Sequence, residues 1–275
     1  MREQNAQIET SLNISTLITK MTIFPVRAFQ DNYIWTIHNA QYAIVVDPGD
    51  AIPVCNYLDT HNLKLLAILV THHHRDHTGG IRDLVELYNT PVYGPRREKI
   101  PCLTHPLGEG DTVEFAELPV KYNVIDIPGH TAGHIAYLWD GGMFCGDTLF
   151  TGGCGKIFEG TPEQLHNSLQ RLARVPDNTL VYCTHEYTEY NTPFALLCEP
   201  DNTELRQWIM DADDLRSRNL PTVPTTMKHE KATNPFLRCA EPEIIRNIER
   251  NTNAKLPDNN EQAVFTAMRL WRDQF

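Results

Sequence analysis

The stretch from residue 65 to residue 77 constrains the fold of this chain more than any other. Its first half, Leu65-Leu66-Ala67-Ile68-Leu69-Val70, has the length and the apolar character of a buried β-strand. Its second half, Thr71-His72-His73-His74-Arg75-Asp76-His77, is polar and follows without a break. The pattern therefore predicts a buried strand that ends at a group of ionisable side chains.

This group has the composition of a metal site. His72, His74, Asp76 and His77 place three imidazoles and one carboxylate within six residues. Imidazole and carboxylate together suit zinc, iron or manganese, whereas calcium prefers oxygen ligands alone. An exposed loop that happens to be rich in histidine is the alternative, and the density of ligands disfavours it.

Composition limits the class of protein. A chain of 275 residues can form one large domain or two modest ones, and 41% hydrophobic with 21% charged residues is typical of a globular protein. The apolar runs are too short to span a bilayer. The net charge of -11 argues against nucleic acid or an anionic membrane as the main partner. An anionic substrate would need a local positive pocket.

The cysteines and the first residues bear on location. The seven cysteines are scattered, without a Cys-x-x-Cys pair, which favours free thiols in a reducing cytosol. Cys154 has no base partner nearby in the sequence, so a thiol nucleophile is disfavoured. Residues 1–20 lack the features of a signal peptide or mitochondrial presequence. We expect a disordered tail, or an upstream start with Met21 as the true beginning, and a cytoplasmic protein.

Local patterns divide the chain near residue 190. Before it, short β-type runs alternate with turns, and after it three stretches have helical spacing. The expected strands cover residues 33–37 and 42–46 (a hairpin), 65–70, 92–93, 112–115, 122–127, 135–139, 143–144 and 180–183, and the expected helices cover 52–60, 79–88, 203–219, 242–251 and 261–274. The simplest organisation is an α/β domain followed by a helical one.

Three further loops follow β-runs and carry candidate ligands. His130 and His134 come after one run, Asp147 after another, and His185 after a third. Because the strand ends of one sheet cluster in space, these side chains could converge with the histidine-rich loop at one edge.

Together these residues resemble the metallo-β-lactamase superfamily. Within it, the chain closely resembles the glyoxalase II family, the hydroxyacylglutathione hydrolases, from Thr22 to Phe275. The resemblance also rests on the segments 29–33, 146–150, 153–156, 159–161, 185–188 and 234–238, which read FQDNY, GDTLF, GCGK, EGT, HEYT and NPFLR. It implies an α/β fold, a metallo-β-lactamase-type αββα sandwich (residues 21–190), with a C-terminal all-helical, substrate-binding domain (residues 191–275).

The resemblance also implies a ligand set for two divalent metal ions, with zinc expected first and iron or manganese as alternatives. His72, His74 and His130 would bind the first metal. Asp76, His77 and His185 would bind the second, and Asp147 would bridge the two, since a carboxylate can give one oxygen to each cation.

Four neighbouring residues are weaker candidates. His73 and Arg75 alternate outward from a segment that we expect to be extended, so both are poor ligands. His134 suits a supporting or core role better than ligation. Asp47 could orient a ligating imidazole or serve as a simple turn residue.

The charges of such a site suggest the reaction. Two divalent cations carry +4, and Asp76, Asp147 and a bridging hydroxide leave roughly +1, while metal binding lowers the pKa of water to about 7. We expect this hydroxide, with Asp76 and Asp147 as catalytic carboxylates, to attack a thioester carbonyl. The leaving thiolate derives from a thiol of pKa about 8.5, so it departs without a strong general acid.

The implied substrate is S-D-lactoylglutathione or a related 2-hydroxyacyl glutathione thioester, which places the reaction in the second step of methylglyoxal detoxification. The resemblance assigns glutathione binding to Lys156, Tyr187, Arg269 and Arg272. Phe158 stands where some members have a ligand-contacting tyrosine, and Arg272 where others have lysine. Solvated surface charge is the alternative for each cation.

Rival functions stay open. The nearest is a glutathione persulfide dioxygenase with a single iron, which we would expect to lack the helical extension and the Gly-Cys-Gly-Lys run. A metal-dependent nuclease is disfavoured by the acidic charge, and a noncatalytic scaffold by the filled ligand positions. We expect a monomer whose partner is the small-molecule thioester, with no nucleic acid and no membrane.

Overall fold

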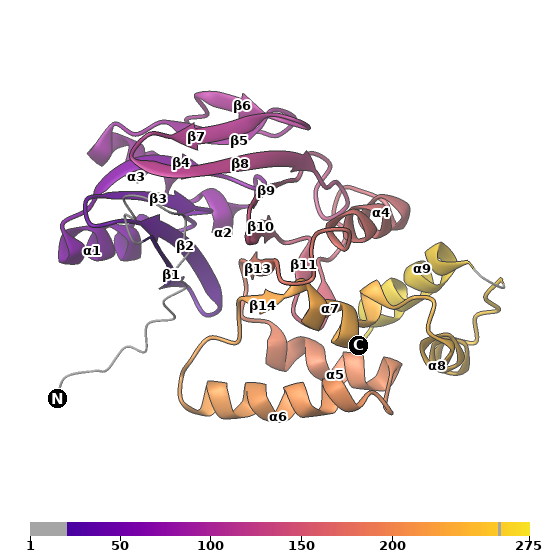
Figure 1. Cartoon of the computed structure of the whole chain (residues 1–275). Helices are drawn as coiled ribbons and strands as arrows, with labels where there is room; N and C mark the ends of the chain where they lie inside the picture. The colour runs from indigo at the N-terminus through magenta and orange to yellow at the C-terminus, as the bar shows by residue number, and fades with distance from the viewer. Residues whose placement is uncertain (1–20, 258–259) are drawn as a thin grey trace. The chain divides into compact units, whose positions relative to one another are not determined.

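The computed structural model describes residues 21–257 and 260–275 (Figure 1). The expectation for residues 1–20 lies outside the described residues. The chain divides into two compact units, and each is described by itself. Unit 1 runs to Ile125 and includes Ile135–Trp139, and unit 2 comprises Asp126–His134 and Asp140–Phe275. The predicted domain boundary at residue 190 is a different division and stays a prediction.

Unit 1 is built on a sheet whose strand order follows the sequence, β1 to β6. The first three strands are antiparallel and the next three pairings are parallel. The predicted hairpin is confirmed, with Ile37 paired to Ile44. The strands are β1 (Thr22–Ala28), β2 (Asn32–His38), β3 (Tyr42–Val46), β4 (Lys64–Leu69), β5 (Val92–Pro95) and β6 (His105–Leu107), and unit 1 also contains β7 (Thr112–Phe115), most of β8 (Leu118–Asp126) and β9 (Ile135–Trp139).

Helices α1 (Ala51–His61) and α3 (Ile81–Tyr88) share a hydrophobic core with this sheet. The cluster contains Val54 and Leu58 of α1 together with Ile68 of β4. Strands buried in a parallel arrangement read as unbroken apolar runs, which is why β3 and β4 were visible in the sequence. Asp50 caps α1 by accepting a hydrogen bond from the Ile52 amide.

One expectation for the histidine-rich loop is wrong. Arg75 does not lie in an extended segment, because a short helix, α2 (Arg75–Thr78), begins there. The Gly79 amide donates to the Arg75 carbonyl at 2.7 Å, and the Thr78 hydroxyl donates to the His74 carbonyl at 2.9 Å. These bonds wind the chain directly after His74 and place Asp76 and His77 on a helical turn.

Unit 2 combines short strands with helices. β10 (Gly142–Gly146) pairs in parallel with β13 (Leu180–Cys183), which pairs with β14 (Thr225–Thr226), and β11 (Leu149–Phe150) forms a ribbon with β12 (Gly153–Cys154). The three helices predicted after residue 190 are confirmed, as α6, α8 and α9. The described helices are α4 (Pro162–Leu172), α5 (Thr188–Cys198), α6 (Thr203–Ser217), α7 (Met227–Thr233), η1 (Pro235–Leu237), α8 (Pro242–Thr252) and α9 (Glu261–Arg272).

The prediction missed α4, α5 and α7. α4 begins at a capping box, in which Thr161 and Gln164 bond each other's backbone amides. α5 contains Pro193 and has no clear apolar stripe, so its sequence does not predict a helix. Among the helices that the structure describes, none combines the length and apolar character needed to cross a membrane.

Candidate metal centre

In unit 1, Asp47 organises the loop that follows β4. It is 2% exposed and accepts hydrogen bonds from the Thr71 amide (2.7 Å), the Thr71 hydroxyl (2.7 Å) and His77 Nδ1 (3.1 Å). Because His77 Nδ1 donates to a carboxylate, the lone pair of this imidazole lies on Nε2. Asp47 therefore orients the ligand candidate His77, which is one of the two roles that we expected for it.

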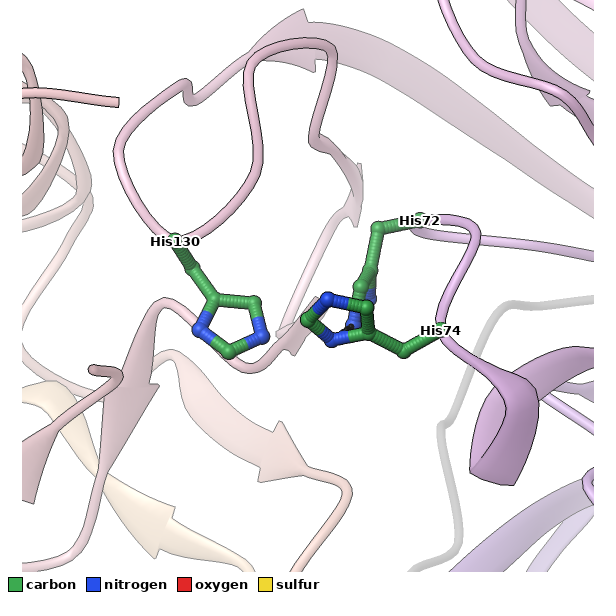
Figure 2. A group of neighbouring side chains, drawn as sticks. All are labelled: His72, His74 and His130. Carbon is green, nitrogen blue, oxygen red and sulfur yellow. Dashed lines mark hydrogen bonds between the residues drawn. The ribbon is translucent and has the colours of Figure 1, made fainter. Parts of the chain in front are cut away.

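His72 and His74 converge on the same loop, and Figure 2 shows their rings close together. His72 Nε2 lies 3.1 Å from His74 Nδ1, and the two rings meet edge to face at 4.7 Å. His72 Nδ1 lies 3.1 Å from the Thr71 hydroxyl, which itself donates to Asp47. These contacts turn one nitrogen of each ring toward a common point, as two ligands of one cation require.

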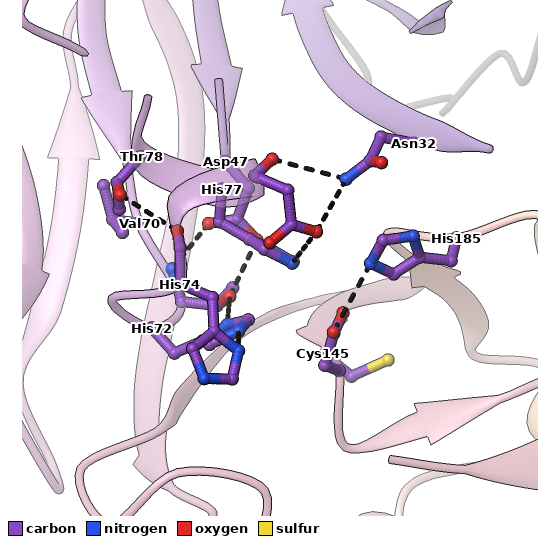
Figure 3. A network of polar contacts seen from close by, with 12 residues as sticks. Asn32, Asp47, Val70, His72, His74, His77, Thr78, Cys145 and His185 are labelled. Atoms are coloured by element: carbon purple, nitrogen blue, oxygen red, sulfur yellow. Dashed lines mark hydrogen bonds and ion pairs between the residues drawn. The ribbon is translucent and has the colours of Figure 1, made fainter. Parts of the chain in front are cut away.

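Asp76 and His77 form a second pair on α2, and Figure 3 shows the His77 ring. His77 Nε2 lies 3.4 Å from Asp76 Oδ2. The Asn32 amide group donates to this same carboxylate oxygen at 3.1 Å and to the Asp76 carbonyl at 3.3 Å. Sequence reasoning quoted Asn32 only within a family motif and missed this contact, which joins residues 44 positions apart.

In unit 2, Asp147 lies between two histidines from different loops. Its Oδ2 atom is 3.5 Å from His130 Nε2 and 3.4 Å from His185 Nε2, and all three side chains are buried. A carboxylate shared by two imidazoles is the arrangement that a bridging ligand needs.

The surrounding backbone of unit 2 fixes these ligands. His130 Nδ1 lies 2.7 Å from the Lys156 carbonyl, so it donates there and places the lone pair on Nε2. The Asp147 amide donates to His134 Nε2 at 3.2 Å, which confirms the supporting role expected for His134. A Cβ at Gly155 would lie 1.9 Å from the Asp147 carbonyl, so the chain there admits only glycine.

Lys156, Phe158 and Tyr187 lie around these ligands in unit 2. The exposed Lys156 ammonium is 5.8 Å from the Phe158 ring, which is 60% exposed and meets the His130 ring edge to face at 5.3 Å. The Tyr187 ring stacks on the His185 ring at 4.5 Å with an interplanar angle of 5°.

Arg269 and Arg272 are buried rather than solvated. Arg269 donates to the Cys154 carbonyl at 3.1 Å and pairs with Asp273 at 3.0 Å, so it ties α9 to β12. Arg272 lies against aromatic rings, at 4.2 Å from the centroid of Tyr190. Burial also raises the pKa of the Cys154 thiol to about 11, which disfavours this cysteine as a nucleophile at neutral pH.

The donor set fits a divalent cation. Nδ1 of His72, His77 and His130 faces a protein oxygen in each case, so that Nε2 is the nitrogen with a lone pair. Imidazole nitrogen and carboxylate oxygen are ligands that zinc, iron and manganese share. In unit 1 a cavity of about 560 Å³ opens beside Asp76, lined also by Phe29, Asn32 and Arg75.

Comparison with known proteins agrees with this chemistry. Residues 29–185 match the model of the metallo-beta-lactamase superfamily, and residues 186–275 match the model described as hydroxyacylglutathione hydrolase C-terminus. A hydroxyacylglutathione hydrolase of Nitrosomonas eutropha is 53% identical over 253 residues, which cover 92% of this chain and 98% of that protein.

Solved structures show the same fold. ETHE1 from Myxococcus xanthus matches with a TM-score of 0.61 at 26% identity, over 92% of this chain and 97% of that one. TTHA1623, solved in a di-iron-bound form, matches with a TM-score of 0.51 at 25% identity, over 82% and 100% of the two chains. The predicted α/β fold of metallo-β-lactamase type, with a helical C-terminal region, is thus confirmed.

The family model over residues 29–185 and the 53% identity to a relative that is covered almost completely agree with the clustered histidines and aspartates. The chain therefore belongs to the hydroxyacylglutathione hydrolase family, metal-binding hydrolases of the metallo-β-lactamase superfamily.

Proposed function

We propose that this chain hydrolyses S-D-lactoylglutathione, and related 2-hydroxyacyl glutathione thioesters, to the hydroxy acid (D-lactate) and glutathione. The observation that carries the proposal is the position of Asp147 Oδ2, at 3.5 Å from His130 Nε2 and 3.4 Å from His185 Nε2. The name of the Nitrosomonas relative supplies the substrate class. The reaction is the second step of methylglyoxal detoxification.

The proposed ligand set has two parts. His72, His74 and His130 hold one divalent cation, Asp76, His77 and His185 hold the other, and Asp147 bridges them. The neighbour in a di-iron-bound form supports two ions, and zinc is proposed with iron or manganese as alternatives. When bound, such cations lower the pKa of water from 15.7 to about 7 and polarise a carbonyl.

The chain's own residues orient this site. Asp47 and the Lys156 carbonyl each hold an imidazole through Nδ1. Asn32 holds the Asp76 carboxylate, and Tyr187 fixes the plane of the His185 ring. Preorganised ligands keep their geometry as charge develops on the thioester, which is how a site of this kind lowers the barrier. Asp76 and Asp147 are the proposed catalytic carboxylates.

The proposed glutathione contacts provide positive charge within an acidic chain. Glutathione conjugates are net anionic, whereas the chain carries -11. Lys156 offers an exposed ammonium, and Arg269 and Arg272 offer guanidinium groups on one side of α9. Tyr187 offers a hydroxyl beside His185. Phe158 offers only a ring, so contact near the thiol is weaker than with tyrosine.

A turnover assay tests the reaction. Loss of thioester absorbance is followed with S-D-lactoylglutathione, on protein as purified and after addition of zinc, iron or manganese. We expect hydrolysis, and metal analysis of freshly purified protein should find two divalent ions per chain. Absence of turnover with every metal would overturn the proposal. Release of sulfite from glutathione persulfide would instead indicate the dioxygenase.

Asp147→Asn tests the bridge. The amide nitrogen cannot ligate a cation, so both metal content and kcat should fall. We expect kcat to fall at least 10-fold, because loss of a residue that only supports a ligand already costs about 10- to 100-fold. Asp140→Asn removes an exposed carboxylate from the same segment and should change neither. Full activity of Asp147→Asn with two metals retained would contradict this role. The cytoplasmic location and the monomeric state stay predictions.

A further inference from the structure

Arg272 is a buried cation whose charge has no counterpart nearby. Its side chain lies in the last turn of α9 and is 7% exposed. Its neighbour Arg269 pairs with Asp273, but no described carboxylate, within residues 21–257 and 260–275, lies within ion-pair distance of Arg272. A buried charge is costly unless it is paired, so this guanidinium is suited to receive an anion from a ligand.

Aromatic rings surround the guanidinium group. Its central carbon lies 4.2 Å from the Tyr190 ring centroid, 5.5 Å from Phe194 and 5.6 Å from Phe275. All three distances fall within the range of about 6 Å for attraction between a cation and a ring face. Phe194 is fully buried, whereas Tyr190 is 64% and Phe275 58% exposed, so these two rings form the outer wall.

Tyr190 also lies beside another proposed substrate contact. Its ring is 6.0 Å from that of Tyr187, which stacks on the ligand candidate His185 at 4.5 Å. Tyr187 is the N-cap of α5 and Tyr190 lies in its first turn, so one helix start places both rings. The side chains of His185, Tyr187, Tyr190 and Arg272 therefore form one continuous row within unit 2.

We propose that Tyr190 is a positioning residue, which stacks on Arg272 and aims its N–H groups at a carboxylate of the glutathione moiety. This inference rests on the proposed function. Stacking covers the face of the planar guanidinium and leaves its donors in the plane, where they can bind a carboxylate through two parallel bonds. The Tyr190 carbonyl already engages one of these nitrogens, Nη2, at 3.4 Å and fixes the rotation of the plane. A lysine ammonium group is not planar, so this stacking arrangement requires arginine at position 272.

Steady-state kinetics with S-D-lactoylglutathione separates a positioning role from a merely structural one. Tyr190→Leu should raise KM about 3- to 10-fold, the range of a cation–π contact at a partly exposed site, with kcat changed less than twofold. Tyr190→Phe keeps the ring and should restore most of the affinity. In an Arg272→Leu background, Tyr190→Leu should raise KM no further, because the cation it positions is gone.

A second exposed side chain on α5 serves as the control. Leu197 is 46% exposed, and Leu197→Ala should leave KM and kcat unchanged. Circular dichroism and metal content check that every variant is folded and loaded. Titration calorimetry with S-methylglutathione, a thioether that cannot be hydrolysed, measures binding directly and should show the same ratio of affinities.

The outcomes distinguish the two proposals. Equal KM and equal S-methylglutathione affinity in wild type and Tyr190→Leu would refute the positioning role, even with full wild-type turnover. Fully additive effects of the Tyr190 and Arg272 substitutions would refute it too. Absence of wild-type turnover would refute the proposed function, and the calorimetric ratio would then decide the role of Tyr190 alone.

Discussion

Substitution of Asp47 by asparagine should separate metal affinity from folding. Asp47 is buried and adopts a left-handed backbone conformation with φ of 53°, which asparagine also tolerates well. The change therefore replaces one carboxylate oxygen by an NH₂ group and adds little backbone strain. Alanine would add that strain and confuse the result.

The magnitude follows from the bonds that change. The remaining oxygen can still accept from the Thr71 amide, but the new donor faces the Thr71 hydroxyl and His77 Nδ1, both of which now donate to Oδ2. His77 must then move its proton to Nε2, which loses the lone pair that a cation needs. Loss of a supporting partner of this kind weakens metal affinity by about 10- to 100-fold, or roughly 1.4–2.7 kcal/mol.

Dialysis against graded chelator, followed by elemental analysis, measures this affinity. We expect Asp47→Asn to lose metal at lower chelator concentration and to regain turnover when metal is in excess. Asp50→Asn is the matched control, because Asp50 caps α1 and asparagine caps equally well. Wild-type metal affinity in Asp47→Asn would refute the orienting role of this carboxylate.

Two further predictions concern the buried interior. Asn234→Ala should lower the free energy of unfolding by about 2–5 kcal/mol in urea titrations, because it removes the donor to the Phe150 and Gly153 carbonyls and leaves buried groups unsatisfied. Asn56→Ala, at an exposed position within α1, is the control and should cause no loss, because alanine forms helix better than asparagine. Equal losses would contradict the role of Asn234 as the anchor of β11 and β12. The pKa of Cys154 is about 11, against an ordinary value of 9.0, so the folded state retains a proton that the unfolded state releases. The free energy of unfolding should therefore fall as pH rises above about 9. Thiol labelling at pH 8 should modify the exposed Cys102 long before Cys154, and rapid labelling of Cys154 in the folded protein would refute this.

Most elements that the sequence predicted correctly carry their signal locally. The unbroken apolar runs of β3 and β4 and the helical spacing of α3, α6 and α9 each concern a few neighbouring residues. α5 was missed because half of its buried face is polar, at Thr188, Asn191 and Thr192, and Pro193 interrupts its pattern. The turn that begins α2 was missed because hydrogen bonds, rather than residue type, wind the chain after His74.

The candidate site divides in the same way. The sequence predicted which residue types can bind a metal, because ligand chemistry depends on side-chain identity. It also predicted the strand ends that carry these residues, because a strand is recognised from the pattern of a few neighbouring residues. It did not determine the roles of Asp47, Asn32 and Tyr190, because each depends on contact with a residue between 24 and 82 positions away. The sequence by itself determined which atoms are available for chemistry. Only the tertiary structure decided which nitrogen of each imidazole carries the proton and which rings face Arg272, because such contacts arise when distant segments pack together.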